Sequence, residues 1–301
     1  MSVRNATLLA LAVVAVSFSA IFIREAHAPA ITIALYRNAI AAAMVLPVAL
    51  VRRRAEIRSL TRTQLGIAVG SGALLAFHFA TWIASLSYTT IAASVVLVTA
   101  SPFLVAVMSS RLFGERMDRT ALAGIVLGLV GAAVVSGGDL FVLSKRAAGG
   151  DLLALAGAVA AGGYFVAGRG LRREVSLLTY IALAYSTCAL LLWPTAVVAG
   201  VRLTGFPART WGLFVLMAVV PQMLGHTVFN YLLRDVSATM VAVSVMGEPV
   251  GSTLLALAFF GEIPPWTAVV GGLLILGGIY AALTSPGRAR RREPQPVMPL
   301  E

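Results

Sequence analysis

The chain has 301 residues, of which 59% are hydrophobic and only 12% are charged. A soluble domain carries roughly 25% charged residues, so this chain lacks the polar side chains needed to cover a globular surface in water. Its formal charge of +11 comes mostly from arginines that lie between apolar blocks, which is typical of membrane topology and argues against nucleic-acid binding. The single cysteine excludes a disulfide framework and a cysteine metal cluster.

The apolar blocks are about twenty residues long, enough for a helix to cross a hydrocarbon layer of ~30 Å. They predict an all-α integral membrane protein with ten transmembrane helices. In chain order the expected helices span residues 5–23, 30–51, 65–86, 91–111, 119–137, 151–168, 177–200, 211–233, 238–260 and 266–284. The first block imitates a signal peptide, but an equivalent run recurs later, so we interpret it as a retained span. The tail, residues 285–301, is expected to be disordered.

The basic residues between the blocks predict how the helices are oriented. With the N-terminus in the cytoplasm, 17 of the 23 lysines and arginines fall on the cytoplasmic side and five on the outer side, while Arg37 lies within a span. Cytoplasmic loops of membrane proteins carry an excess of Lys and Arg. We therefore expect both termini in the cytoplasm.

A shift of 147 residues aligns the second half of the chain with the first. It places "SPFLVAVMSSRLFGERMDRTALAGIVLGLVG" (101–131) over "EPVGSTLLALAFFGEIPPWTAVVGGLLILGG" (248–278), so that glycines, two Gly-Glu pairs and a proline coincide. We interpret this as two repeats of five helices, residues 1–140 and 141–284. Because five is odd, the repeats must enter the membrane with opposite orientation. Inverted repeats are common in secondary transporters, in which two halves move around a central site.

Three stretches carry a resemblance to a known family: "LYRNAIAAAMVLP" in the second span, the run into Pro102 that ends in "GE" at 114–115, and "FNYLLRDVSATMVAVSVMGEPVGSTLLALAFFGE" at 229–262. With them the chain resembles the EamA family of the drug/metabolite transporter superfamily, and within it bacterial aromatic-amino-acid exporters of the YddG type. The resemblance implies a secondary transporter that exports amino acids, including aromatic ones, or similar small metabolites across the bacterial inner membrane. It also implies alternating access, with the solute held in a cavity between the repeats.

Two charged residues lie away from the ends of the predicted spans, where each costs up to ~3 kcal/mol of insertion free energy and therefore marks a functional candidate. Arg37 can pair with a substrate carboxylate or with a protein carboxylate. Glu248 has the neutral Ser101 as its counterpart in the first repeat, so only one half carries this charge. We assign both residues to gating or coupling. The sequence leaves open whether they pair and whether protons are coupled.

Two polar stripes are predicted to line the cavity. His78 and Trp82 lie four residues apart on one face of the third span, and Gln222, His226 and Asn230 follow the same spacing in the eighth. The alternative for each stripe is hydrogen bonding between helices that only fixes their packing. For Trp82 a second alternative is the aromatic belt at the membrane boundary.

Hydroxyl and aromatic side chains inside other spans suit a cavity that holds an amphipathic solute loosely. The further candidates are Thr99, Ser101, Tyr164 and Ser244. Packing between close helices is the alternative for each of them.

Two prolines coincide under the 147-residue shift, Pro102 and Pro249. Each removes a backbone donor in the middle of a span, so both are expected to bend their helices at the same place. Glu115 and Glu262 follow a glycine at the ends of these helices and are expected to be structural.

The sequence has none of the patterns of an enzyme site: no metal-ligand pair, no nucleophile elbow and no phosphate-binding loop. Neither a cofactor nor an ATPase subunit is therefore implied, and a small-molecule substrate and membrane lipid are the expected partners. The alternatives to amino-acid export are a proton-coupled exporter of drugs or toxic cations and, less favoured, a channel, for which no ring of identical polar residues marks a filter. A membrane enzyme or a scaffold is a third class, disfavoured by the missing catalytic residues.

Overall fold

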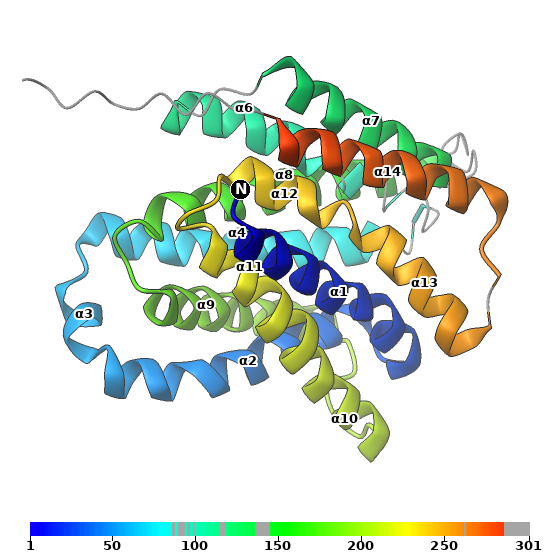
Figure 1. The fold of residues 1–301 in the computed structure, drawn as a ribbon. Helices are drawn as coiled ribbons and strands as arrows, with labels where there is room; N and C mark the ends of the chain where they lie inside the picture. Colours follow the sequence, from blue (N-terminus) through cyan, green and yellow to red (C-terminus); the bar gives the residue numbers. More distant parts are fainter. Residues whose placement is uncertain are drawn as a thin grey trace, which may run out of the picture.

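The computed structural model describes residues 1–85, 88–89, 94, 97–98, 100–114, 118–135, 145–261 and 263–285. Within these ranges the regular structure is helical throughout, and Figure 1 shows how the helices pack into a bundle. In chain order the elements are α1 (Val3–Ala26), α2 (Ala30–Arg52), α3 (Arg54–Ser59), α4 (Arg62–Ser85), α6 (Ser101–Phe113), α7 (Arg119–Val135), α8 (Lys145–Leu171), α9 (Leu177–Val198), α10 (Ala208–Met217), the π-helix η2 (Ala218–His226), α11 (Thr227–Leu232), α12 (Ala238–Val245), α13 (Glu248–Phe260) and α14 (Trp266–Thr284).

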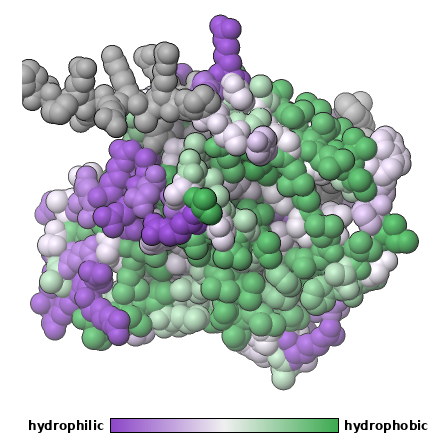
Figure 2. Space-filling model, viewed as in Figure 1, coloured by the Kyte–Doolittle hydropathy of each residue, from purple (hydrophilic) through white to green (hydrophobic). Residues whose placement is uncertain are grey.

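The described part of the chain contains eight helical spans long and apolar enough to cross a membrane. Two of them are composite: Ala208–Leu232 joins α10, η2 and α11, and Ala238–Phe260 joins α12 and α13. The shorter apolar helix α6 overlaps the expected span 91–111 and ends two residues beyond it, and α7 lies within the expected span 119–137; parts of both spans lie outside the described residues. Figure 2 shows hydrophobic side chains over the middle of the visible face and hydrophilic ones mainly toward the side of the bundle that holds α3, with smaller hydrophilic groups elsewhere at its edges. The chain is therefore a multi-pass membrane protein.

Short polar residues and glycines set the ends of several helices. Ser2, Ser176 and Ser237 precede α1, α9 and α12, and each hydroxyl accepts a hydrogen bond from the backbone N–H three residues later. Each cap satisfies a donor that the start of a helix leaves without an intrahelical partner. Gly114 and Gly261 end α6 and α13 with φ of 65° and 67°, a left-handed conformation that glycine adopts at little cost.

Helices α6 and α13 are related by the 147-residue shift. The first runs from Ser101 to Phe113 and the second from Glu248 to Phe260, so their bounds agree residue for residue. Their prolines lie in the first turn, where a helix does not need the missing N–H.

The break in the ninth span corrects the expectation of one bent helix over 238–260. Helix α12 ends at Val245, a two-residue turn follows, and α13 begins anew at Glu248 in mid-span. Pro249 therefore lies in the first turn of α13, directly after the break. At the equivalent position in the first half of the chain, α6 begins at Ser101 directly after a turn at Ala100.

Helices α7 and α14, also related by the shift, lie side by side (Figure 1). A Cβ placed on Gly124 would lie 2.5 Å from the carbonyl oxygen of Gly278, and one on Gly131 would lie 2.6 Å from that of Gly271. Backbones that approach this closely require glycine at the contact. The contacts make the two helices antiparallel. They are also reciprocal, because the shift converts Gly124 into Gly271 and Gly131 into Gly278.

Helices α2 and α9 pack in the same reciprocal way. At the start of α9, the hydroxyls of Ser176 and Thr179 donate to Glu56 of α3, the short helix that follows α2. At the start of α2, the hydroxyl of Thr32 donates to the carbonyl of Arg202, which follows α9, over 2.8 Å. The shift converts Thr32 into Thr179, so each helix start is held by the segment that follows the other helix. We refer to the side of the bundle that holds α3 as the α3 side.

Candidate functional site

A cavity of about 640 Å³ lies between the helices, within the range of ~300–1,000 Å³ that small-molecule sites occupy. Its lining comes from α1, α2, α4, α6 and α7 of the first half and from α8, η2, α11, α12 and α13 of the second. Most lining residues are apolar or aromatic. The side chains that bring polar atoms are Ser19, Arg37, His78, Trp82, Ser101, Tyr164, His226, Glu248, Ser252 and Thr253.

Arg37 projects from α2 and is only 4% exposed. Its Nε donates to the side-chain oxygen of Gln222 over 2.6 Å, and its Nη1 lies 3.4 Å from the hydroxyl of Ser19. Its guanidinium carbon lies 4.9 Å from the centre of the Phe79 ring, a cation–π contact. Its Nη2 is buried and has no hydrogen-bond partner among the described residues.

Glu248 is the first residue of α13 and lines the same cavity. The positive end of the helix dipole favours a carboxylate at this position. Its backbone carbonyl accepts a hydrogen bond from Ser17 of α1. Arg37 and Glu248, both described residues, form no ion pair with each other. The cavity therefore holds two opposite charges that are kept apart.

His78 and Trp82 of α4 line the cavity as the helical spacing predicts. Their rings stack with centroids 5.9 Å apart and planes 7° from parallel. The Nδ1 of His78 lies 2.9 Å from the carbonyl oxygen of Gly157 in α8, so this nitrogen carries the proton and donates. The indole N–H of Trp82 is buried and has no partner among the described residues. These geometries agree with a place in the cavity for Trp82 and do not require the boundary belt.

The three polar residues of the stripe in the eighth span contact different neighbours. His226 lines the cavity, and its Nδ1 is buried without a partner in the described part of the chain. Gln222 and Asn230, expected to line the cavity as well, are fully buried and do not line it. Gln222 binds Arg37, and the Asn230 amide donates to the Tyr164 hydroxyl over 2.5 Å. The stripe therefore faces inward as a whole, but Gln222 and Asn230 lie behind Arg37 and Tyr164, the residues that line the cavity.

The other residues predicted from the sequence fall into two groups, those that line the cavity and those that do not. Ser101, Tyr164 and Pro249 line the cavity. Ser244 does not: its hydroxyl bonds the carbonyl of Met240 in its own helix over 2.9 Å. Pro102 is buried outside the lining. Thr99, Glu115 and Glu262 lie outside the described residues.

Comparison with known proteins identifies the family. A model described as the EamA-like transporter family matches residues 4–137 and, a second time, residues 148–284. The chain therefore belongs to the EamA-like transporter family.

Relatives of this EamA-like transporter include two named exporters. The chain is 27% identical to "Pseudopaline exporter CntI" of Pseudomonas aeruginosa, over 84% of this chain and 87% of that protein. It is also 27% identical to the "Probable terminal-alkyne amino-acid exporter" of Streptantibioticus cattleyicolor, over 65% of each chain. A solved crystal structure with 20% identity matches 93% of this chain and 97% of its own with a TM-score of 0.78, which shows the same fold.

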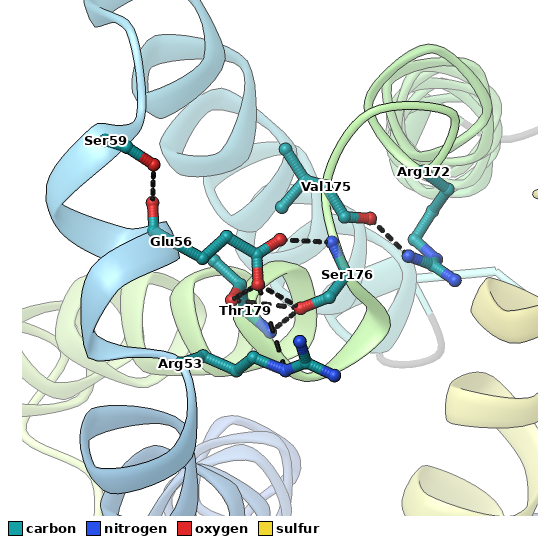
Figure 3. Close-up of polar contacts among 7 residues, drawn as sticks. All are labelled: Arg53, Glu56, Ser59, Arg172, Val175, Ser176 and Thr179. Atoms are coloured by element: carbon teal, nitrogen blue, oxygen red, sulfur yellow. Dashed lines mark hydrogen bonds and ion pairs between the residues drawn. The ribbon is translucent and has the colours of Figure 1, made fainter.

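On the α3 side, Glu56 has a structural role that was not predicted from the sequence. Its carboxylate accepts from the backbone N–H and the hydroxyl of Ser176, both over 2.6 Å, and from the hydroxyl of Thr179 over 2.9 Å (Figure 3). Partial burial raises its pKa, but these hydrogen bonds and the charge of Arg53 outweigh that effect and hold the pKa below the usual value. Glu56 thereby caps the start of α9 from the other half of the chain.

Two residues that hold Arg37 were also missed, Ser19 and Phe79. Ser19 follows Ser17 in the first span, and this pair of hydroxyls in an apolar run was the available signal. Phe79 gave no signal, because an aromatic residue in an apolar helix is most simply a packing residue. Only the fold brings both residues to the arginine.

Proposed function

We propose that this EamA-like transporter is a secondary exporter of amino acids, including aromatic ones, or of similar small metabolites, across the bacterial inner membrane. The observation that carries the proposal is the cavity between the two halves, in which Arg37 and Glu248 remain unpaired. An apolar cavity with two separated opposite charges suits an amphipathic solute that carries both charges. The two relatives named exporters support the direction of transport.

Alternating access between inverted repeats is part of the proposal. Its support is the reciprocal contact of α7 with α14 and of α2 with α9, because a two-fold axis in the membrane plane produces antiparallel contacts between equivalent helices. The helix starts at Ser101 and Glu248 add support, because discontinuous helices often form the substrate sites of such transporters. The distribution of Lys and Arg along the chain supports the proposal that the α3 side of the bundle and both termini lie in the cytoplasm.

The test is flux in vesicles that contain the purified full-length protein alone. Vesicles are loaded with individual radiolabelled amino acids, aromatic and small polar alike, and efflux is followed against protein-free vesicles. We expect saturable efflux of at least one of them. Efflux that does not saturate, or that appears only with a second protein, would contradict the proposal.

A second candidate function is the proton-coupled export of organic cations. The observation that favours it is Glu248 in a cavity that Phe79 and Trp82 also line, since aromatic rings and a carboxylate both attract cations. In the same vesicles, a pH gradient that drives ethidium efflux without any amino-acid flux would select this function. Discrete single-channel currents would instead select a channel.

A further inference from the structure

We propose that the unpaired edge of the Arg37 guanidinium is a subsite for the carboxylate of the transported solute, and that Gln222 is the residue that positions it. This inference rests on the proposed function, because it names one end of the solute that the cavity would hold. In this inference Arg37 binds the solute, and Gln222 holds Arg37 in position.

The contacts of Arg37 leave one nitrogen of its guanidinium, Nη2, without a hydrogen-bond partner among the described residues. The side-chain oxygen of Gln222 fixes Nε, Phe79 covers one face, and the hydroxyl of Ser19 makes only a long contact with Nη1. Nη2 is buried and without a partner among the described residues, while Arg37 itself lines the cavity. A buried cationic donor that lacks a partner is costly, and a ligand that supplies an acceptor removes that cost.

The chemistry of this edge selects the ligand class. Nη1 and Nη2 present parallel N–H groups that match the two oxygens of a carboxylate. The repeat supplies no second such site, because the 147-residue shift converts Arg37 into Ala184. The subsite is therefore single, and it lies in the same cavity as Glu248, which can take the positive end of a zwitterion.

Gln222 acts through Arg37 and not on the solute. It is fully buried and does not line the cavity. It lies in η2, where its backbone carbonyl accepts from both the N–H and the hydroxyl of Thr227, an i to i+5 pattern that fixes the wide turn. The bond from Arg37 to Gln222 also joins the first half of the chain to the second.

The experiment measures binding to the purified full-length protein with three probes of one shape. These are L-phenylalanine, 3-phenylpropionate, which lacks the ammonium group, and 2-phenylethylamine, which lacks the carboxylate. Arg37→Met should raise the dissociation constants of the two carboxylate probes about tenfold or more and that of the amine less than about twofold. Arg37→Lys should lie between, because it keeps the charge and loses the fork.

Two Gln222 variants separate positioning from folding. Gln222→Met keeps the size and removes the acceptor, and we expect it to weaken both carboxylate probes about threefold to tenfold. Gln222→Glu gives Arg37 an ionic partner and should weaken them at least as much. Because general damage to the fold would weaken all three probes together, the ratio of 3-phenylpropionate to amine affinity is the decisive quantity. Gln64→Met, the same change at an exposed position on the α3 side, is the matched control and should leave the ratio unchanged.

Three results would overturn the inference: no binding of either carboxylate probe to the folded wild-type protein, equal loss of all three probes in Arg37→Met, or an unchanged ratio in both Gln222 variants. Flux in vesicles is measured separately. If carboxylate binding depends on Arg37 but no saturable flux is found, the proposed transport function is contradicted and the subsite is supported. If flux is saturable but shows no preference for a carboxylate, the subsite is contradicted and the transport function is supported.

Discussion

At the contact between α7 and α14, positions related by the 147-residue shift carry the same residue, since Gly124 and Gly131 meet Gly278 and Gly271. In the cavity the related positions differ, because Glu248 corresponds to Ser101 and Arg37 to Ala184. The backbones around Ser101 and Glu248 nevertheless match, down to the bounds of α6 and α13. The repeat thus sets the packing of the helices, whereas the charges that suit a solute are present once.

The largest effect should come from breaking the shared contact. Gly124→Ala places a Cβ 2.5 Å from the carbonyl oxygen of Gly278 and 2.8 Å from the backbone nitrogen of Ala282, and neither backbone can move aside locally. We expect a loss of about 2–3 kcal/mol in stability, which is typical of overpacking, measured as a lower melting temperature and reduced yield in detergent. Gly70→Ala is the matched control, because a Cβ there meets nothing within 4 Å. Equal stability of the two variants would show that the close contact is absent.

The next effect should come from removing the charge asymmetry of the cavity. Glu248→Gln keeps the size and removes the charge, and we expect efflux to fall about tenfold or more and its pH dependence to change, because a charged residue within a membrane span is costly and marks a functional position. Ser101→Ala, at the equivalent position in the same cavity, removes no charge and should lower efflux less than Glu248→Gln does. If Glu248→Gln left both the flux and the pH response as in the wild type, Glu248 would have no part in coupling.

A smaller effect is expected from the stacked pair in α4. His78→Ala removes the ring that stacks on Trp82 and the hydrogen bond to Gly157. The KM for the transported amino acid should rise about threefold to tenfold, the size expected for one or two polar or aromatic contacts. The abundance of the protein in the membrane should change less than the KM. Parallel losses in KM and abundance would instead indicate a packing role.

The smallest effect is expected at the link between α3 and α9. Glu56→Gln should cost about 1 kcal/mol near neutral pH, the usual size of a helix cap. Because hydrogen bonds hold the folded-state pKa of Glu56 below its ordinary value of 4.5, the wild-type advantage is complete above that value and disappears as the pH falls through the lowered pKa. Melting curves of both proteins between pH 7 and acid, as far as the detergent allows, give the difference. Glu174→Gln, an exposed carboxylate that binds Gln64, is the control. An advantage independent of pH would contradict the capping role.

Much of the architecture could be predicted from the sequence. The length of the apolar blocks located the eight long spans, because a helix has few ways to cross hydrocarbon. The 147-residue shift predicted that Ser101 and Glu248 are equivalent, and both begin a helix. The breaks were harder to anticipate, since a proline can either bend a helix or open a new one, and the sequence alone does not decide between them.

The candidate site was predictable only in part. Charged residues and histidines in apolar spans are costly, and this cost alone selected Arg37, Glu248, His78 and His226, all of which line the cavity. The four-residue spacing placed Gln222 and Asn230 on the inward face, but neither lines the cavity, because Arg37 and Tyr164, which bind them, do. The local signal for the wide turns is Pro221, which lies inside η2 and lacks the backbone N–H that an α-helix would use.

The sequence by itself determined that this chain is a membrane protein with a repeated, helical plan, because the length of the apolar blocks and the similarity of the two halves can be measured on the sequence without knowing which residues meet. Only the tertiary structure decided which side chains meet. Gln222 reaches Arg37 across 185 positions, and Glu56 caps a helix 120 positions away. Such contacts depend on how helices from the two halves pack, and the hydrophobic pattern fixes which face of a helix is buried without fixing its neighbour.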